Sequence, residues 1–341
     1  MYNNIRSSIN TERVSVLLRE KAIDIDQKKV LITNFSGSDQ EKDLTVPVNC
    51  EGFGRVRHFK LDAGKEWIQN PLPILPAAKA LGVKPCSQIR AQVFQSSVCN
   101  WRCWYCFVDY KLLNGDSNHA SFLTCDEMID LYLREENPAL MIDLTGGQPG
   151  LTPEWIPWMM QTLKGKGLDK KIYLWSDDNL SNDYLWKYLS NEQIDLMSSY
   201  EMYSRVCCFK GIDERSFSLN TKADPKFFSN QFELFNRLLE INLDLYCYII
   251  LVANTDTNFE MEIPKFLDKV QTIDEMLPLR ILPLKIFDVY TPVSTRIDEK
   301  YKDMLNGQYI ALDVWKKELL KRFSEKQLLL PITEIELKKF K

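Results

Sequence analysis

Three cysteines in one short segment, Cys99-Asn-Trp-Arg-Cys103-Trp-Tyr-Cys106, constrain this chain more than any other feature. Their spacing is C-x3-C-x2-C, so the thiols can face one centre only if the segment wraps around it. Thiolates bind soft or borderline metals, which indicates an iron–sulfur cluster or zinc. A structural zinc site needs four ligands, and the two histidines, His58 and His119, do not lie at zinc-finger spacing. A 4Fe–4S cubane normally takes four thiolates, so three would leave one iron open to another ligand.

This segment resembles the cluster-binding loop of the radical SAM superfamily. In that family three cysteines bind three irons of a 4Fe–4S cluster, and the amino and carboxylate groups of S-adenosylmethionine bind the fourth. The resemblance implies that Cys99, Cys103 and Cys106 are the cluster ligands. Tyr105 occupies the family's aromatic position before the third cysteine, which implies a contact to the adenine side of the cofactor. The alternative is a set of unrelated buried thiols, because free cysteine is common in protein cores.

The composition is that of an ordinary soluble protein. Of 341 residues 45% are hydrophobic and 26% charged, and the net charge of −4 does not indicate a general nucleic-acid or membrane surface. No apolar run reaches the length of a bilayer span, and Met1–Arg6 lacks the apolar part of a signal peptide. The nine cysteines are not spaced as a disulfide framework. We therefore expect a reduced, cytoplasmic protein, which would also suit an oxygen-sensitive cluster.

Three parts are expected along the chain. Residues 1–86 show no strong periodicity, and we interpret them as an extension that caps or flanks the core domain. Residues 87–290 would form that domain, and residues 291–341 would be a C-terminal helical segment that covers the open side or the bottom of its sheet. Within the extension, Gly52 and Gly54 predict tight turns rather than a phosphate-binding loop. Candidates from this region to face the active site are Cys50, Arg55, Arg57 and His58.

Strand and helix patterns alternate from residue 87 onward. A capping box at Thr124 and Glu127 predicts the start of the first helix. Buried strands separated by helices predict a parallel sheet with right-handed crossovers. The radical SAM resemblance implies the same α/β architecture, a partial (β/α)6 TIM-like barrel with an N-terminal extension and C-terminal helices. The expected strands are residues 88–95, 140–144, 171–175, 204–209, 243–252 and 279–287.

The turn after the second strand reads Thr145-Gly146-Gly147-Gln148-Pro149. Ligands of parallel βα folds bind at the carboxyl ends of the strands. The turn resembles the family's GGE motif, whose glycine backbone hydrogen-bonds the amino group of the cofactor's methionine. The resemblance implies that Gly146, Gly147 and Gln148 bind S-adenosylmethionine. Gln148 replaces the usual glutamate and would accept a hydrogen bond from an ammonium without charge assistance. The alternative is a glycine turn that only begins a helix.

Polar residues follow other strands too. Ser176 and Asp178, after the third strand, would bind the ribose or carboxylate of S-adenosylmethionine, or the substrate, or cap the next helix. Lys210, after the fourth strand, places a cation near the mouth, where family enzymes often place polar residues against the cofactor. Arg280 and Lys285 on the sixth strand are substrate-facing cations or solvated rim charges.

The remaining cysteines do not predict a second cluster. Cys207 and Cys208 are adjacent on a strand, so their side chains point to opposite faces. No cysteine follows Cys247, although family members with auxiliary clusters usually carry cysteine-rich segments there. Cys86, thirteen residues before Cys99, is close enough in the chain to be a further candidate for the site.

The resemblance implies a reaction class. A reduced cluster would split S-adenosylmethionine into methionine and a 5′-deoxyadenosyl radical, which abstracts hydrogen from a substrate. We expect a small-molecule or peptide substrate and a flavodoxin- or ferredoxin-type electron donor. One alternative is an activase that makes a glycyl radical on a partner enzyme, and another is a non-catalytic zinc-binding protein. A large open mouth favours the activase, whereas a mouth closed by residues 1–86 favours a small substrate.

Overall fold

A seven-stranded sheet forms the centre of the molecule in the computed structural model, which describes residues 8–339. The strand order is β10-β9-β8-β7-β6-β4-β3, in which β3 is antiparallel to β4 and all other neighbours are parallel. The expected partial barrel of six parallel strands is therefore confirmed. The strands are β3 (Gly54–Lys60), β4 (Gln88–Gln95), β6 (Met141–Thr145), β7 (Tyr173–Asp178), β8 (Tyr203–Phe209), β9 (Leu245–Ile249) and β10 (Ile281–Pro283).

The sheet curls so that one face encloses a core. Phe59 of β3, Trp175 of β7 and Tyr246 of β9 belong to one buried cluster, although four strands separate β3 from β9 in the sheet. In a flat sheet those two strands would lie about 24 Å apart, since neighbouring strands are about 4.8 Å apart. The concave face is thus the interior of the partial barrel.

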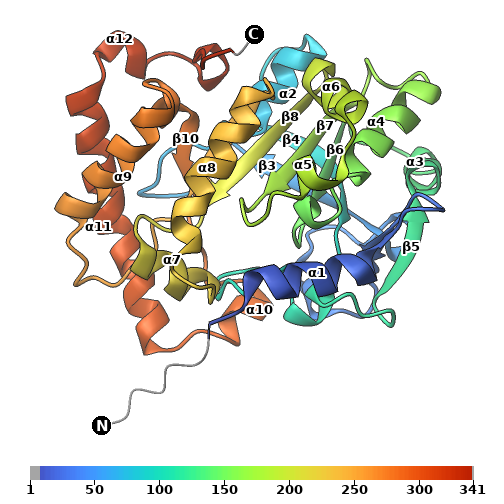
Figure 1. Ribbon diagram of the computed structural model, residues 1–341, viewed down its shortest axis with the longest axis horizontal. Coiled ribbons are helices and arrows are strands. Elements are labelled where there is room, and N and C mark those ends of the chain that lie inside the picture. Colours follow the sequence, from blue (N-terminus) through green and yellow to red (C-terminus); the bar gives the residue numbers. More distant parts are fainter. Residues whose placement is uncertain (1–7, 340–341) are drawn as a thin grey trace.

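Helices cover the convex face of the sheet (Figure 1). Ile142 of β6 packs in the same core as Met159 and Phe235 from two of these helices. The predicted capping box is confirmed, because Thr124 Oγ1 accepts the N–H of Glu127 and Glu127 Oε2 accepts the N–H of Thr124. The helices are α3 (Cys125–Leu133), α4 (Trp155–Gly165), α5 (Tyr184–Tyr188), α6 (Asn191–Ser199), α7 (Glu214–Thr221), α8 (Phe227–Glu240) and α9 (Phe259–Ile273), with short 3-10 turns η3 (Tyr110–Leu113), η4 (Pro149–Leu151) and η5 (Leu277–Arg280).

Residues before β3 build a helix and a second, smaller sheet. Helix α1 (Thr11–Ala22) lies beside the segment that follows β4, where Trp101 Nε1 donates to Thr11 Oγ1. The small sheet has the antiparallel order β1-β2-β5 and joins the N-terminal region to a strand that precedes α3. Its strands are β1 (Ile23–Asp24), β2 (Lys29–Thr33) and β5 (Ala120–Thr124), and two 3-10 turns follow β2, η1 (Asp39–Asp43) and η2 (Cys50–Gly52).

The segment between β3 and α2 (Ile74–Leu81) closes the open side of the barrel. Trp67 Nε1 donates to the carbonyl of Pro283 at 2.9 Å, and Lys285 Nζ donates to the carbonyl of Lys65 at 3.0 Å. The segment therefore connects the two edge strands of the sheet, β3 and β10. The C-terminal segment reaches the amino end of the strands at η6 (Ile332–Glu334), which packs against α2.

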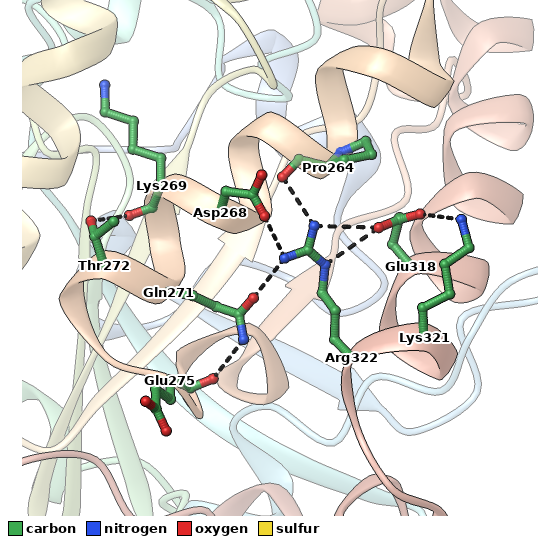
Figure 2. A network of polar contacts seen from close by, with 9 residues as sticks. All are labelled: Pro264, Asp268, Lys269, Gln271, Thr272, Glu275, Glu318, Lys321 and Arg322. Atoms are coloured by element: carbon green, nitrogen blue, oxygen red, sulfur yellow. Dashed lines mark hydrogen bonds and ion pairs between the residues drawn. The ribbon is translucent and has the colours of Figure 1, made fainter.

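The C-terminal helices are α10 (Thr291–Ser294), α11 (Glu299–Arg322) and α12 (Glu325–Leu328). Figure 2 shows how Arg322 fastens the end of α11 to α9. Its Nη1 donates to Asp268 Oδ1 at 2.6 Å and to Gln271 Oε1 at 2.7 Å, while Nη2 donates to the carbonyl of Pro264 at 3.3 Å. The carboxylate of Glu318 accepts from Arg322 on its other side. One guanidinium therefore satisfies acceptors on both helices.

Several element bounds differ from the prediction. Strand β7 extends through Asp178, so Ser176 and Asp178 lie within it rather than after it. Strands β9 and β10 are shorter than expected, because apolar residues such as Ile250 and Val252 are buried without joining the ladder. Burial and strand pairing give the same apolar pattern in a sequence. Met1–Arg6 and residues 340–341 lie outside the described residues.

Among the described helices, none combines the length and apolar character that crossing a lipid bilayer needs.

Replacing Arg322 should lower stability more than replacing an exposed cation on the same helix. In Arg322→Met the acceptors on α9 lose their shared donor, so we expect unfolding to be easier by about 1–3 kcal/mol. Lys317 lies on α11 in a 3.9 Å ion pair with both side chains about 63% exposed, so Lys317→Met should change stability by about 0.5 kcal/mol or less. Urea unfolding measures both. Equal midpoints for the two variants would contradict this view of the α9–α11 contact.

Candidate functional site

The cysteine loop crosses the carboxyl end of the parallel strands and is held by backbone hydrogen bonds. The backbone N–H of Cys99 donates to the carbonyl of Leu113. At the end of α7, the carbonyl of Thr221 accepts the N–H of Arg102, and the carbonyl of Asn220 accepts the N–H of Trp104. The segment between β10 and α11 fastens the far end of the loop, because Arg296 Nη1 donates to the carbonyl of Cys106 at 2.6 Å.

Side chains between the cysteines anchor the loop in the protein. Asn100 is fully buried, and its Nδ2 donates to Ser15 Oγ of α1 at 2.9 Å and to Ser181 Oγ at 2.8 Å. The indole N–H of Trp104 donates to Asn220 Oδ1 at 3.1 Å. Because these residues bind inward to neighbouring elements, the backbone around the thiols is fixed from several directions.

The three loop thiols share one partly enclosed region. Cys99 is buried and Cys103 and Cys106 are half-buried, and all nine cysteines are free thiols. Burial raises the pKa of Cys103 to about 12, with smaller contributions from neighbouring Cys106 and Cys99, whereas nearby Lys210 lowers it. A cation beside three thiols would favour their thiolate forms, the forms that bind metal.

Within residues 8–339, no group of three His, Cys, Asp or Glu side chains is placed to hold a single metal ion. A 4Fe–4S cubane differs from a single ion, because each cysteine thiolate binds a different iron atom. The donor set of Cys99, Cys103 and Cys106 therefore fits the chemistry of a cubane better than that of one zinc ion.

Lys210 and Cys208 lie next to the loop thiols. Burial alone would lower the pKa of Lys210, but the thiols of Cys208 and Cys103 raise it above its ordinary value. Both side chains are deeply surrounded by protein yet keep part of their surface exposed, as side chains that line a concave interior do. Tyr105 is buried beside Cys103, so the structure brings Tyr105 and Lys210 to the thiols.

The double-glycine turn packs directly on the segment that leads into the cysteine loop. The N–H of Gln148 donates to the carbonyl of Val98 at 2.7 Å. Gly146 and Gly147 have φ of +65° and +56°, and a Cβ on Gly147 would overlap the carbonyl oxygens of Val98 and Ser96. Only glycine allows this backbone approach. The turn and the cysteine loop therefore form one unit.

Gln148 is buried beneath that unit and joined to Asp178. Its Nε2 donates to Asp178 Oδ1 at 2.9 Å, and its Oε1 accepts the N–H of Asn179 at 3.0 Å. Asp178 Oδ2 accepts from Arg205 Nη1 at 3.0 Å. The amide of Gln148 must donate to a carboxylate here, which a glutamate could not do unless protonated.

Ser176 belongs to the same network and not to the region of the thiols. It is fully buried, and its hydroxyl lies 2.8 Å from the hydroxyl of Tyr203, which in turn accepts from Arg205 Nε at 3.0 Å. Alternate residues of a strand point to opposite faces, so Ser176 and Asp178 face away from the barrel interior, whereas Asp177 faces into it.

Other candidates lie elsewhere. Arg280 donates to Asp244 and to the carbonyl of Leu245, at the amino end of the strands and far from the thiols. Cys86 is exposed just before β4, at the end opposite the cysteine loop, and Cys50 packs beside Glu135 at the end of α3. Lys285 binds the carbonyl of Lys65.

Sequence reasoning missed one set of residues in the barrel interior. Asp143 and Asp177 both face it, as do Arg55 and Arg57, which were candidates without a partner. The signal for Asp143 was present in the sequence, since it is a carboxylate in the middle of an otherwise apolar strand that is buried along its length.

Changing Gln148 to glutamate should destabilise the turn. In Gln148→Glu two buried carboxylates would face each other, so we expect a loss of about 2–3 kcal/mol. Adding Asp178→Asn supplies a donor and should recover part of that loss in the double variant, although the Arg205 ion pair is weakened. Urea unfolding of Gln148→Glu, Asp178→Asn and the double variant, compared with the parent, forms a double-mutant cycle. Additive changes in the free energy of unfolding would show that the two side chains do not interact.

No protein-family model matches the chain, and neither does any curated protein. Among solved structures, Streptococcus suis SuiB bound to precursor peptide SuiA matches with a TM-score of 0.41 and 15% identity, over 66% of this chain and 46% of that one. Native anSMEcpe with bound AdoMet matches with a TM-score of 0.39 and 17% identity, over 66% and 60%. SuiB bound to S-adenosylmethionine gives 0.37 and 17%, over 53% and 37%. The chain spans less than two thirds of each of these proteins.

Proposed function

We propose that this chain is a radical SAM enzyme that binds one 4Fe–4S cluster and S-adenosylmethionine. The observation that carries the proposal is the joining of two loops at the carboxyl end of a parallel partial barrel. The loop with the three thiols begins directly after Val98, whose carbonyl accepts the N–H of Gln148 and lies against Gly147 of the double-glycine turn. Ligands of parallel βα folds bind at this end of the strands.

Each residue of the site has a proposed role. Cys99, Cys103 and Cys106 would hold the cluster, and Tyr105 would lie against the adenine side of the cofactor. The backbone of Gly146 and Gly147 would bind the amino group of the cofactor's methionine. Three further residues act by fixing this turn through their hydrogen-bond network, namely Gln148, Asp178 and Ser176.

When bound, these groups supply a 5′-deoxyadenosyl radical that abstracts hydrogen from a substrate. The chain itself orients the cofactor and excludes water. Trp101 and Trp104 are each 1% exposed and pack the loop against α1 and α7. Lys210 places a positive charge beside the thiols and stabilises added negative charge there.

The substrate class in this proposal is a small molecule or a peptide, and the electron donor is of the flavodoxin or ferredoxin type. We place the reaction in the cytoplasm, where thiols stay reduced. The zinc-binding alternative has less support, because within residues 8–339 no three His, Cys, Asp or Glu side chains are placed to hold one metal ion, and a structural zinc site needs four ligands.

Replacing any loop cysteine should abolish the cluster. After anaerobic reconstitution we expect about four irons per chain, and slow 5′-deoxyadenosine formation with dithionite and S-adenosylmethionine. Cys103→Ala should lose most of the iron and all of the nucleoside. Cys86→Ala is the matched control, because Cys86 is exposed at the far end of β4 and should leave both values unchanged. One zinc per chain with no nucleoside would overturn the proposed function.

Lys210→Met should make the cluster harder to reduce. A cation stabilises the more negative reduced state, so its removal should lower the midpoint potential by on the order of 70 mV, from a unit charge about 10 Å away at an effective dielectric constant of about 20. Lys285→Met is the control, because Lys285 binds the carbonyl of Lys65 on the open side of the barrel. A redox titration followed by electron paramagnetic resonance measures both. An unchanged midpoint potential in Lys210→Met would show that the charge of Lys210 does not act on the cluster.

A further inference from the structure

Four charged side chains point into the interior of the barrel and take no part in the proposed cofactor site. Arg55 and Arg57 come from β3, Asp143 from β6 and Asp177 from β7. Strand β4 lies between β3 and β6. Its Val93 pairs with Arg55 of β3 on one side and with Asp143 of β6 on the other, so Arg55 and Asp143 are at the same level of the sheet. Asp177 lies between these residues and Lys210, and although burial raises the pKa of Asp177, the positive charge of Lys210 acts to lower it.

Two of these charges are buried without hydrogen bonds to any described residue. Asp143 is fully buried, and neither carboxylate oxygen has a hydrogen-bond partner. Arg57 Nη1 is 3.8 Å from Asp143 Oδ2, which is an ion pair but not a hydrogen bond. Arg55 is 5% exposed, and its Nε and Nη2 have no partner. Charged groups in this state carry a desolvation penalty that nothing within residues 8–339 offsets by hydrogen bonding.

The protonation equilibria show the same penalty. Burial, then the charge of Asp177, raises the pKa of Asp143 well above its usual range, although Arg57 and Arg55 oppose the rise. Burial and Arg57 lower the pKa of Arg55 to about 10, which still leaves it cationic at neutral pH. By contrast, Asp177 accepts a hydrogen bond from Thr145 Oγ1 and is partly exposed, so it gives the interior an accessible edge.

The unpaired atoms specify the chemistry of a ligand. Nε and Nη2 of an arginine lie on one edge of the guanidinium, the edge that binds a carboxylate with two parallel hydrogen bonds. Two free carboxylate oxygens on Asp143 accept N–H groups, and an ammonium supplies them. An ammonium beside Asp143 would favour its ionised form, and the four side chains then carry two charges of each sign. A simple anion or cation would therefore leave one side unpaired, whereas a ligand with both charges satisfies both.

The enclosure of the barrel favours a small ligand. The carboxylate of Asp43 in η1 accepts from the backbone N–H of Thr291 at 2.9 Å and from its hydroxyl at 2.8 Å, which joins the N-terminal region to α10 at the carboxyl end of the strands. Residues 61–73 close the open side between β3 and β10. The rings of Phe107 and Phe35 lie 5.5 and 5.8 Å from the Arg55 guanidinium.

We infer that the barrel interior binds a free α-amino acid, with its carboxylate on Arg55 and its ammonium on Asp143. The inference rests on the proposed function only in making this amino acid the hydrogen donor. In that step one C–H bond of the amino acid breaks and its hydrogen atom forms a C–H bond at C5′ of the radical. The products are 5′-deoxyadenosine and a carbon radical on the amino acid.

Binding is tested on the reconstituted protein by thermal unfolding with each standard L-amino acid, in the presence of saturating S-adenosylmethionine. We expect at least one of them to raise the midpoint by several degrees. Arg55→Met and Asp143→Asn should weaken its binding by roughly 10- to 100-fold, as measured by calorimetric titration. Arg55→Met should be at least as stable as the parent without ligand, because it removes a buried cation whose Nε and Nη2 have no partner. Asp143→Asn should lose some stability without ligand, because it leaves Arg57 without its ion-pair partner. Arg90→Met is the control, since Arg90 lies on β4 and bonds the carbonyl of Asn137.

Three outcomes would overturn the inference: no amino acid binds, binding survives both substitutions, or S-adenosylmethionine displaces the amino acid. If both variants fail to fold, the charges are structural and the inference also fails. A deuterated mixture of L-amino acids then tests the link to the reaction, because deuterium should appear in 5′-deoxyadenosine. Nucleoside formation without amino-acid binding would contradict this inference alone, whereas binding without any nucleoside would contradict the proposed function and leave the binding site standing.

Discussion

Close contact between the backbones of Gly147 and Val98 is the constraint on which the site depends. It arises because β4 and β6 are parallel neighbours, with Gln95 opposite Thr145, so the loops that leave both strands must emerge side by side. A side chain at Gly147 would force them apart. The three thiols and the double-glycine turn are therefore positioned relative to each other by sheet register, and the anchors of Asn100 and Trp104 only refine that placement.

The two faces of β7 are used in opposite ways. On the face toward the helices, Asp178 accepts three hydrogen bonds, from the side chains of Gln148 and Arg205 and from the backbone N–H of Leu180, and the network it forms is rigid. Satisfied buried networks fix a unique geometry. On the interior face, Asp177 accepts a hydrogen bond from Thr145, and Asp143 on the neighbouring strand accepts none from residues 8–339. This difference is expected if Asp178 has a structural role and Asp143 binds a ligand.

The sequence predicted those parts of the fold whose signals are local. Buried strands followed by amphipathic helices indicated the six parallel strands. Three cysteines within eight residues indicated the cysteine loop. The pairing of β3 with β4, and of β2 with β5, had no such signal, because the partners are far apart in the chain and β3 carries arginines on its buried face. The interior charges were missed for the same reason, since only the curled sheet brings β3, β6 and β7 together.

The N-terminal extension and the core domain consequently contribute different things. Residues of the core provide the thiols, the glycine turn and Lys210, all of which follow parallel strands in chain order. The extension adds Arg55 and Arg57 to the interior, closes the open side through Trp67, and joins α10 through Asp43. Under the proposed function, the parallel strands would carry the cofactor site and the edge strand β3 would set the charge of what the interior accepts. Under that proposal, selectivity for substrate would depend on β3 and residues 61–73, which belong to the part of the chain with the weakest sequence signal.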